Sequence, residues 1–258
     1  MAGHLALALH AHLPFVRHPE HEEFFEEDWL FEAITETYIP LLNVLERLMR
    51  DAVAFKLTMS ITPPLCAMLQ DELLRSRYVR HLDRLLSLAE RECDRTRGEP
   101  ELQELARFYL DLLQSTRRQF DDQWQRDLLG RFRHFRDAGV LEIIASAATH
   151  GLLPLLAQSP EAVRAQVLVG LDVYRDIFGA DPAGFWLPEC AYAPGLDRIL
   201  QEANIRWFIL DAHGLMFGKP RPRRAIYAPC FTPAGPAAFA RDPESSRQVW
   251  SADSGYPG

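Results

Sequence analysis

Short apolar runs alternate with amphipathic helical patterns along most of this sequence. The runs that have the length of buried strands lie at 4–9, 53–58, 141–145, 184–186 and 207–210. The segments in which apolar residues recur at helical spacing are 28–49, 160–178 and 194–203. Strands and helices that alternate in this way favour a parallel sheet with right-handed crossovers. The sequence therefore predicts an α/β fold.

Polar residues gather where the predicted strands end. Those that follow a predicted strand are His10, His12, His150, Glu189, Asp211 and His213. Ligand sites of parallel α/β folds lie at the carboxyl ends of the strands. We therefore expect these side chains to share one site.

A long stretch between the second and third predicted strands has no strand pattern. Over 63–138 one apolar stripe recurs at helical spacing, which predicts a helical insertion. A chain of 258 residues suits a single α/β barrel, which often has about 200–250 residues, and we expect one barrel domain over 1–258 with this insertion. Three short runs near the end, at 225–227, 237–240 and 248–250, are candidates for further strands.

Charge and composition exclude several classes of partner. The net charge is −8 with both signs mixed along the chain, so we expect no nucleic-acid partner. The amino terminus has no basic segment of a signal peptide, and no apolar run reaches about 20 residues, so we expect a cytoplasmic protein without a membrane partner. Cys66, Cys93, Cys190 and Cys230 are scattered and indicate neither a zinc knuckle nor a disulfide framework.

Glu189 lies in the FWLPEC stretch at 185–190, directly after a predicted buried strand. Pro188 stiffens this loop and Trp186 offers a face on which a sugar can stack, so the carboxylate suits glycosidic chemistry; the alternative is a solvated loop residue. Other tryptophans fit core positions as well as sugar platforms. Trp29 and Trp250, which have charged or small polar neighbours, are the better candidates for platforms.

His10 and His12 lie on the same side of an extended chain, because side chains repeat with period two. Three interpretations stay open for this pair: it binds zinc, it donates hydrogen bonds to sugar hydroxyls, or it packs as a structural pair. His150 is a single histidine before Gly151, a residue that permits an unusual backbone angle.

Three motifs together resemble those of glycoside hydrolase family 57. They are HAHLPF at 10–15, ATHG at 148–151 and WLPEC at 186–190. Within that family, further segments look most like those of the 1,4-α-glucan branching enzymes. These segments are AYAPG at 191–195, LDAHG at 210–214, RDPESS at 241–246, VWS at 249–251 and GYPG at 255–258.

The resemblance implies an incomplete (β/α)7 barrel and a retaining mechanism. Glu189 matches the position of the nucleophile, and an aspartate of the family's fourth motif serves as acid and then as base. We expect that motif beyond Gly258, because neither Asp211 nor Asp253 lies in a similar sequence. The resemblance thus implies the amino-terminal part of a barrel that is truncated at its carboxyl end.

The expected activity is transfer on α-1,4-glucan without a cofactor or metal. The residues that this resemblance and the strand ends suggest for substrate binding are His10, His12, Trp29, His150, Trp186, Asp211, His213, Arg241 and Trp250. Three alternatives remain: a 4-α-glucanotransferase or amylase of the same family, a metal-dependent carbohydrate hydrolase or deacetylase with His10, His12 and Asp211 as ligands, and an inactive glucan-binding fragment.

Overall fold

The computed structural model describes residues 3–253 and divides into two compact units. The first unit comprises 1–12, 57–64 and 142–258, and the second comprises 13–56 and 65–141. The assignment of 63–138 as an insertion within one barrel domain remains a prediction. None of the described helices is long and apolar enough to cross a lipid bilayer.

A mostly parallel sheet forms the centre of the first unit. Its strands within the described residues are β1 (Ala8–Ala11), β2 (Leu57–Ile61), β3 (Leu141–Ser146), β4 (Gly184–Trp186), β5 (Trp207–Leu210), β6 (Cys230–Phe231) and β7 (Ala237–Ala240). The spatial order is β1-β2-β3-β4-β5-β7-β6, and only the short β6 is antiparallel to its neighbour among the pairings that are described. This is the α/β fold that the strand and helix pattern predicts, in the form of the incomplete (β/α)7 barrel that the family resemblance implies.

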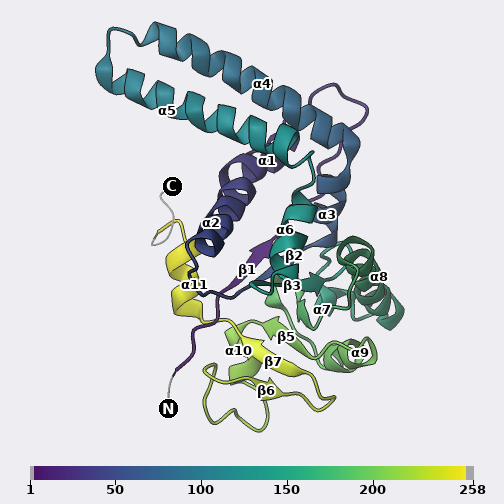
Figure 1. Ribbon diagram of the computed structural model, residues 1–258. Helices are drawn as coiled ribbons and strands as arrows, with labels where there is room; N and C mark the ends of the chain where they lie inside the picture. Colours follow the sequence, from purple (N-terminus) through teal and green to yellow (C-terminus); the bar gives the residue numbers. More distant parts are fainter. Residues whose placement is uncertain (1–2, 254–258) are drawn as a thin grey trace. The chain divides into compact units, whose positions relative to one another are not determined.

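Helices follow most of these strands and lie beside the sheet (Figure 1). They are α7 (Leu153–Leu156), α8 (Pro160–Phe178), α9 (Leu196–Glu202), α10 (Ala212–Met216) and α11 (Pro243–Trp250), with a 3₁₀ turn, η3 (Pro188–Cys190). Ser159 caps α8 by accepting a hydrogen bond from the N–H of Ala162. On α8, Gly170 lies so close to the Ser146 carbonyl that a Cβ would be 2.2 Å from it, so only glycine permits this packing.

Several predicted boundaries are wrong. The first strand begins at Ala8 because its pairing with β2 begins there, whereas Leu5 and Leu7 are exposed. The second strand is Leu57–Ile61 and not 53–58, because a turn at 51–52 after the preceding helix delays the return to the sheet.

The expectations for the carboxyl-terminal runs have mixed outcomes. The strand at 237–240 is confirmed, whereas 225–227 forms a turn. Residues 248–250 end a helix, because Asp242 caps it and Pro243 occupies its first position.

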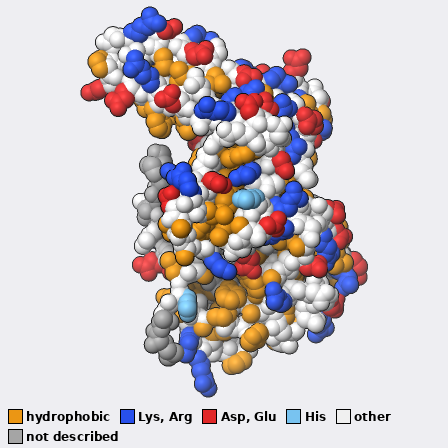
Figure 2. Space-filling model, in the orientation of Figure 1, with side chains coloured by type: hydrophobic (Ala, Val, Ile, Leu, Met, Phe, Trp, Pro, Cys, Tyr) orange, Lys and Arg blue, Asp and Glu red, His pale blue; other side chains and the backbone are white. Residues whose placement is uncertain are grey.

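The second unit is helical. Its elements are α1 (Glu27–Glu32), the π-helix η1 (Ala33–Tyr38), α2 (Ile39–Arg50), α3 (Pro63–Gln70, which begins in the first unit), α4 (Glu72–Arg95), α5 (Pro100–Arg117), the π-helix η2 (Arg118–Gln123) and α6 (Leu128–Asp137). The long helices α4 and α5 pack as an antiparallel hairpin (Figure 1), over which acidic and basic side chains are interspersed (Figure 2). The helical character predicted for 63–138 is thus confirmed.

Candidate active site

Two histidines, one within β1 and one directly after it, lie at the carboxyl end of this strand. His10 is the last but one residue of β1, and His12 follows the strand, so their rings lie on one side with centroids 6.0 Å apart. Each Nδ1 pairs with a hydroxyl group from β2 or the residue after it: His10 with Ser60 Oγ at 3.3 Å, and His12 with Thr62 Oγ1 at 2.9 Å. The pairing of His10 follows from the register, because Ser60 is its direct neighbour across the strands.

His150 and Trp186 complete a cluster of aromatic rings around this pair. The His150 ring lies 4.0 Å from the His12 centroid and 4.9 Å from that of His10, and Trp186 stacks on His10 at 4.4 Å with an interplanar angle of 5°. Trp186 is only 6% exposed, so its ring supports the histidines from behind and leaves little of its face open.

A left-handed backbone conformation directs His150 into this cluster. His150 has φ +57°, whereas the following Gly151, expected from the sequence to take the unusual angle, is not among the glycines with positive φ. The strain of a non-glycine residue in this region is offset by the hydrogen bond between His150 Nδ1 and Ser146 Oγ at 3.1 Å.

Burial keeps the histidines neutral. Loss of water lowers the pKa of His10 to about 3, and the nearby His150, His12 and Arg241 lower it further; the same loss of water, with His12, lowers that of His150 to about 4. Burial also lowers the pKa of His12, although the charge of Glu189 opposes this shift. Neutral imidazoles both donate and accept hydrogen bonds, as sugar hydroxyls require of their partners.

Glu189 follows β4 in the turn η3, with φ 52° and ψ 22°. Its side chain is exposed and makes no hydrogen bond within residues 3–253, while its charge acts on His12 and on the Cys190 thiol. Burial raises the pKa of that thiol to about 11, so Cys190 remains protonated beside the carboxylate. A free, exposed carboxylate in a strained turn at a strand end has the accessibility that a nucleophile needs.

A third group of side chains links the ends of β4, β5 and β7. The backbone N–H of Asp211 donates to the Cys190 carbonyl at 2.8 Å, and its carboxylate pairs with His213 Nδ1 at 3.3 Å and accepts a hydrogen bond from Arg241 Nη2 at 3.0 Å. Arg241 is close enough to His10 to lower its pKa. The Arg241 Nε atom is buried and has no hydrogen-bond partner in the described part of the chain.

The first unit thus brings together most of the candidates predicted from the sequence. They are His10, His12, His150, Trp186, Glu189, Asp211, His213 and Arg241. Ser60, Thr62 and Ser146, the hydroxyl partners of the histidines, are not among the residues predicted from the sequence. Their signal is present, because each lies at or next to a strand end, as the histidines do.

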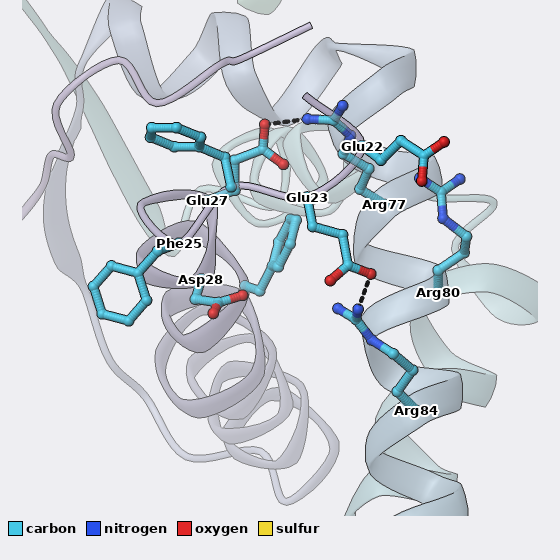
Figure 3. Close-up of a pocket in the computed structure, with 10 residues that line it drawn as sticks. Glu22, Glu23, Phe25, Glu27, Asp28, Arg77, Arg80 and Arg84 are labelled. Carbon is cyan, nitrogen blue, oxygen red and sulfur yellow. Dashed lines mark hydrogen bonds and ion pairs between the residues drawn. The ribbon is translucent and has the colours of Figure 1, made fainter. Parts of the chain in front are cut away.

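Two tryptophan candidates are not placed in this group. Trp250 ends α11, and its side chain lies outside the described part of the chain. Trp29 is exposed on α1 in the second unit. The neighbouring Asp28 lines a pocket of about 170 Å³ between the segment 22–31 and α4 (Figure 3).

Ion pairs hold the walls of that pocket together. Glu27 and Arg77 form a buried pair, and Glu23 pairs with Arg84, which lies about two turns further along α4 (Figure 3). Arg77 also donates to the carbonyls of His18 and His21, so the segment before α1 is fixed to α4.

In the residues that the structure describes, no group of three or more His, Cys, Asp or Glu side chains is arranged to hold a metal ion. The Nε2 atoms of His10 and His150 lie 3.3 Å apart and bind each other. The arrangement thus offers neutral hydrogen-bonding groups beside a free carboxylate.

Comparison with known proteins identifies relatives over the whole chain. The sequence profile described as Glycosyl hydrolase family 57 matches residues 6–251. A 1,4-α-glucan branching enzyme of Thermococcus kodakarensis is 35% identical over 291 residues, which cover all of this chain and 41% of that protein.

Two solved structures are similar throughout. The α-amylase AmyC from Thermotoga maritima has a TM-score of 0.93 and 46% identity, with 100% of this chain and 49% of that one covered. The branching enzyme from Pyrococcus horikoshii has a TM-score of 0.88 and 37% identity, with 97% and 49% covered. The chain spans about half the length, or less, of each of these three proteins.

Proposed function

The chain belongs to glycosyl hydrolase family 57, and from this premise we propose that it carries the nucleophile of a retaining transglycosylase acting on α-1,4-glucan, a 1,4-α-glucan branching enzyme. The observation that carries the proposal is the position of Glu189, whose exposed carboxylate follows β4, makes no hydrogen bond within residues 3–253 and lies close enough to His12 to act on its pKa. Residues 1–258 form the amino-terminal part of the catalytic barrel in this proposal, with 63–138 as its helical insertion.

The first half of the reaction breaks the α-1,4 bond. A Glu189 oxygen attacks the anomeric carbon, the bond from that carbon to O4 breaks, and O4 leaves with a proton from a general acid. The enzyme then holds the donor chain as a glucosyl ester. In the second half, the 6-hydroxyl of another glucan unit attacks the same carbon, gives its proton to the base and releases Glu189, which forms the α-1,6 branch.

The acid is proposed to be an aspartate that follows residue 258. Asp211 is a poor candidate, because its carboxylate already binds Arg241 and pairs with His213. Asp253 is exposed and lies in a turn after α11. Retaining enzymes hold the two carboxyl groups about 5–5.5 Å apart across the scissile bond. The proposed aspartate therefore has to lie at about this distance from the Glu189 carboxylate.

The remaining candidates line the sugar subsite in this proposal. His10, His12 and His150 form its polar wall, with Trp186 stacked on His10. Asp211 directly precedes α10 and His213 lies within it; the two side chains pair with each other, and Asp211 also binds Arg241. Trp29 and Trp250 are proposed as platforms for sugar units further along the glucan. A cytoplasmic role in glycogen synthesis fits the branched product.

An α-amylase is the second candidate, because the T. maritima structure with 46% identity bears that name. In that case water replaces the 6-hydroxyl in the second half of the reaction. Incubation of the complete protein with amylose distinguishes the two: a branching enzyme produces α-1,6 anomeric proton signals in NMR with few new reducing ends, whereas an amylase produces reducing ends alone. Absence of both products would reject the proposal.

A further inference from the structure

A chain of hydrogen bonds runs through the histidine cluster and ends on a peptide carbonyl. Ser146 Oγ is 2.9 Å from the Trp186 carbonyl oxygen, which can only accept. The single hydroxyl proton of Ser146 is therefore used in this bond. Any further hydrogen bond of Ser146 Oγ is one that it accepts.

The second partner of Ser146 is His150, whose Nδ1 lies 3.1 Å away. Because Ser146 has no proton left to give, His150 Nδ1 carries the hydrogen and donates. His150 is neutral, since burial and the neighbouring His12 lower its pKa to about 4. A neutral imidazole carries one proton, so His150 Nε2 is a bare acceptor.

The position of the proton on His150 also fixes the proton on His10, because His10 Nε2 lies 3.3 Å from His150 Nε2. One of these two atoms has to donate, and His150 Nε2 cannot. His10 therefore carries its proton on Nε2, which leaves Nδ1 as an acceptor for the Ser60 hydroxyl at 3.3 Å. Each of the four hydrogen bonds then has one donor and one acceptor.

We infer that these bonds run in one direction, from Ser60 through His10, His150 and Ser146 to the Trp186 carbonyl, and that Ser146 is a positioning residue that fixes the tautomers of both histidines. Each hydroxyl group and each imidazole in this series of hydrogen bonds is satisfied by another member of the series. The series of hydrogen bonds ends on Trp186, three residues before Glu189, so it also holds the end of β4, which the proposed nucleophile follows.

The order of these bonds gives the three histidines different roles. Both ring nitrogens of His10 and of His150 are used, whereas His12 uses only Nδ1, in its bond with Thr62, and its Nε2 has no partner within residues 3–253. If the proposed function holds, His12 is the histidine that binds a sugar hydroxyl, and the other two hold it in place. The assignment of the tautomers does not depend on that function.

Solid-state ¹⁵N NMR of histidine-labelled protein tests the order directly, because ring nitrogens with and without a proton have well separated shifts. His10→Gln and His150→Gln variants assign the signals by removing one ring each. We expect the proton on Nδ1 of His150 and on Nε2 of His10 at neutral pH. The reverse order, an equal mixture of tautomers or a doubly protonated ring at either residue would overturn the inference.

Ser146→Ala and Thr62→Val form a matched pair of hydroxyl deletions. The first should abolish the preference of His150 for Nδ1–H and leave His10 with mixed tautomers. The second removes a hydroxyl whose side-chain hydrogen bond among residues 3–253 is to His12, so it should leave the tautomers of His10 and His150 unchanged. Unchanged tautomers in Ser146→Ala would show that Ser146 does not position them, and the spectrum of the unaltered protein tests the order even if a variant fails to fold.

Addition of maltotetraose to the labelled protein separates the two proposals. We expect the His12 signals to shift while the tautomers of His10 and His150 persist. A change of tautomer at His10 or His150 on binding would overturn this assignment of roles. No shift at any histidine would count against the proposed sugar site and would leave the tautomer order as measured.

Discussion

Arg241 donates a hydrogen bond from Nη2 to Asp211 Oδ2 over 3.0 Å. The pair joins the loop after β5 to the loop after β7, and the backbone N–H of Asp211 continues the connection to the Cys190 carbonyl. Asp211 is thereby occupied as an anchor, in keeping with a general acid that lies elsewhere in the protein.

Replacement of this anchor tests that assignment. We expect Asp211→Asn in the complete protein to lower kcat/KM by about tenfold or less, because a partly exposed ion pair contributes about 1 kcal/mol or less. The alkaline limb of the pH–rate profile, on which the rate falls as the general acid loses its proton, should remain. Loss of that limb with a decrease of about 10²–10⁴-fold, typical of a missing general acid, would identify Asp211 as the acid. Asp253→Asn, at an exposed position, is the matched control.

Stability should fall as the pH decreases below about 6.5. His10 and His150 stay neutral in the folded chain, where their pKa values are about 3 and about 4, whereas they are protonated below about pH 6.5 when unfolded. The unfolded state therefore binds the extra protons, and each histidine lowers the free energy of unfolding by up to about 1.4 kcal/mol per pH unit between these values. Above this window neither contributes a pH dependence.

Denaturant titrations at several pH values measure this slope. The double variant His10→Gln/His150→Gln should show a shallower dependence than the unaltered chain, whatever its absolute stability. His134→Gln, at an exposed position on α6, serves as the control and should keep the original slope. Equal slopes in all three proteins would mean that the cluster is protonated when folded.

The histidine cluster should bind no zinc. The Nε2 atoms of His10 and His150 bind each other, and Asp211 is engaged by Arg241. Metal analysis of protein purified without added metal should therefore find less than stoichiometric zinc, and EDTA should leave the activity unchanged. Stoichiometric zinc that is lost together with the activity on chelation would favour the metal-dependent hydrolase.

Residues 1–258 on their own should associate. In the part of the chain that the structure describes, the edge strand β1 pairs with a neighbour on one side only. The preceding Leu5 and Leu7 are 86% and 58% exposed, and hydrophobic side chains are exposed over β6 and β7 (Figure 2). Unpaired edges and apolar patches promote association. Light scattering should detect oligomers, which Leu5→Lys/Leu7→Lys should reduce. A soluble monomer of the unaltered chain would contradict this expectation.

The sequence predicts the central strands well and the first two poorly. β4 and β5 are short apolar runs that are almost completely buried, and β3 is apolar and buried except for the exposed Glu142 and the buried Ser146, so their pattern is easily read as buried strands. In β2 the hydroxyl residues Thr58 and Ser60 alternate with Met59 and Ile61, so the strand is less apolar than the mostly exposed run that begins at Val53. The apolar pattern therefore places the predicted strand too early in the sequence.

Most residues of the candidate site could be predicted from the sequence, but their geometry could not. Strand ends and motif resemblance suffice to select His10, His12 and Glu189. The geometry of the site depends on backbone conformations that the residue types do not indicate, because His150 and Glu189 both have positive φ, which residues other than glycine rarely adopt. The burial of Trp186 could not be predicted from the sequence either, because only the fold determines that its ring stacks on His10.

The central claim is that Glu189 forms a covalent bond with the donor sugar. Incubation of the complete protein with a 5-fluoro-α-glucosyl fluoride, whose glucosyl ester hydrolyses slowly, followed by proteolysis and mass spectrometry, tests it most directly. We expect one fluoroglucosyl group on the peptide that contains Glu189, and none in Glu189→Gln, whose amide cannot attack as an anion. A label on another carboxylate, or turnover by Glu189→Gln above about a tenth of the original rate, would contradict the account.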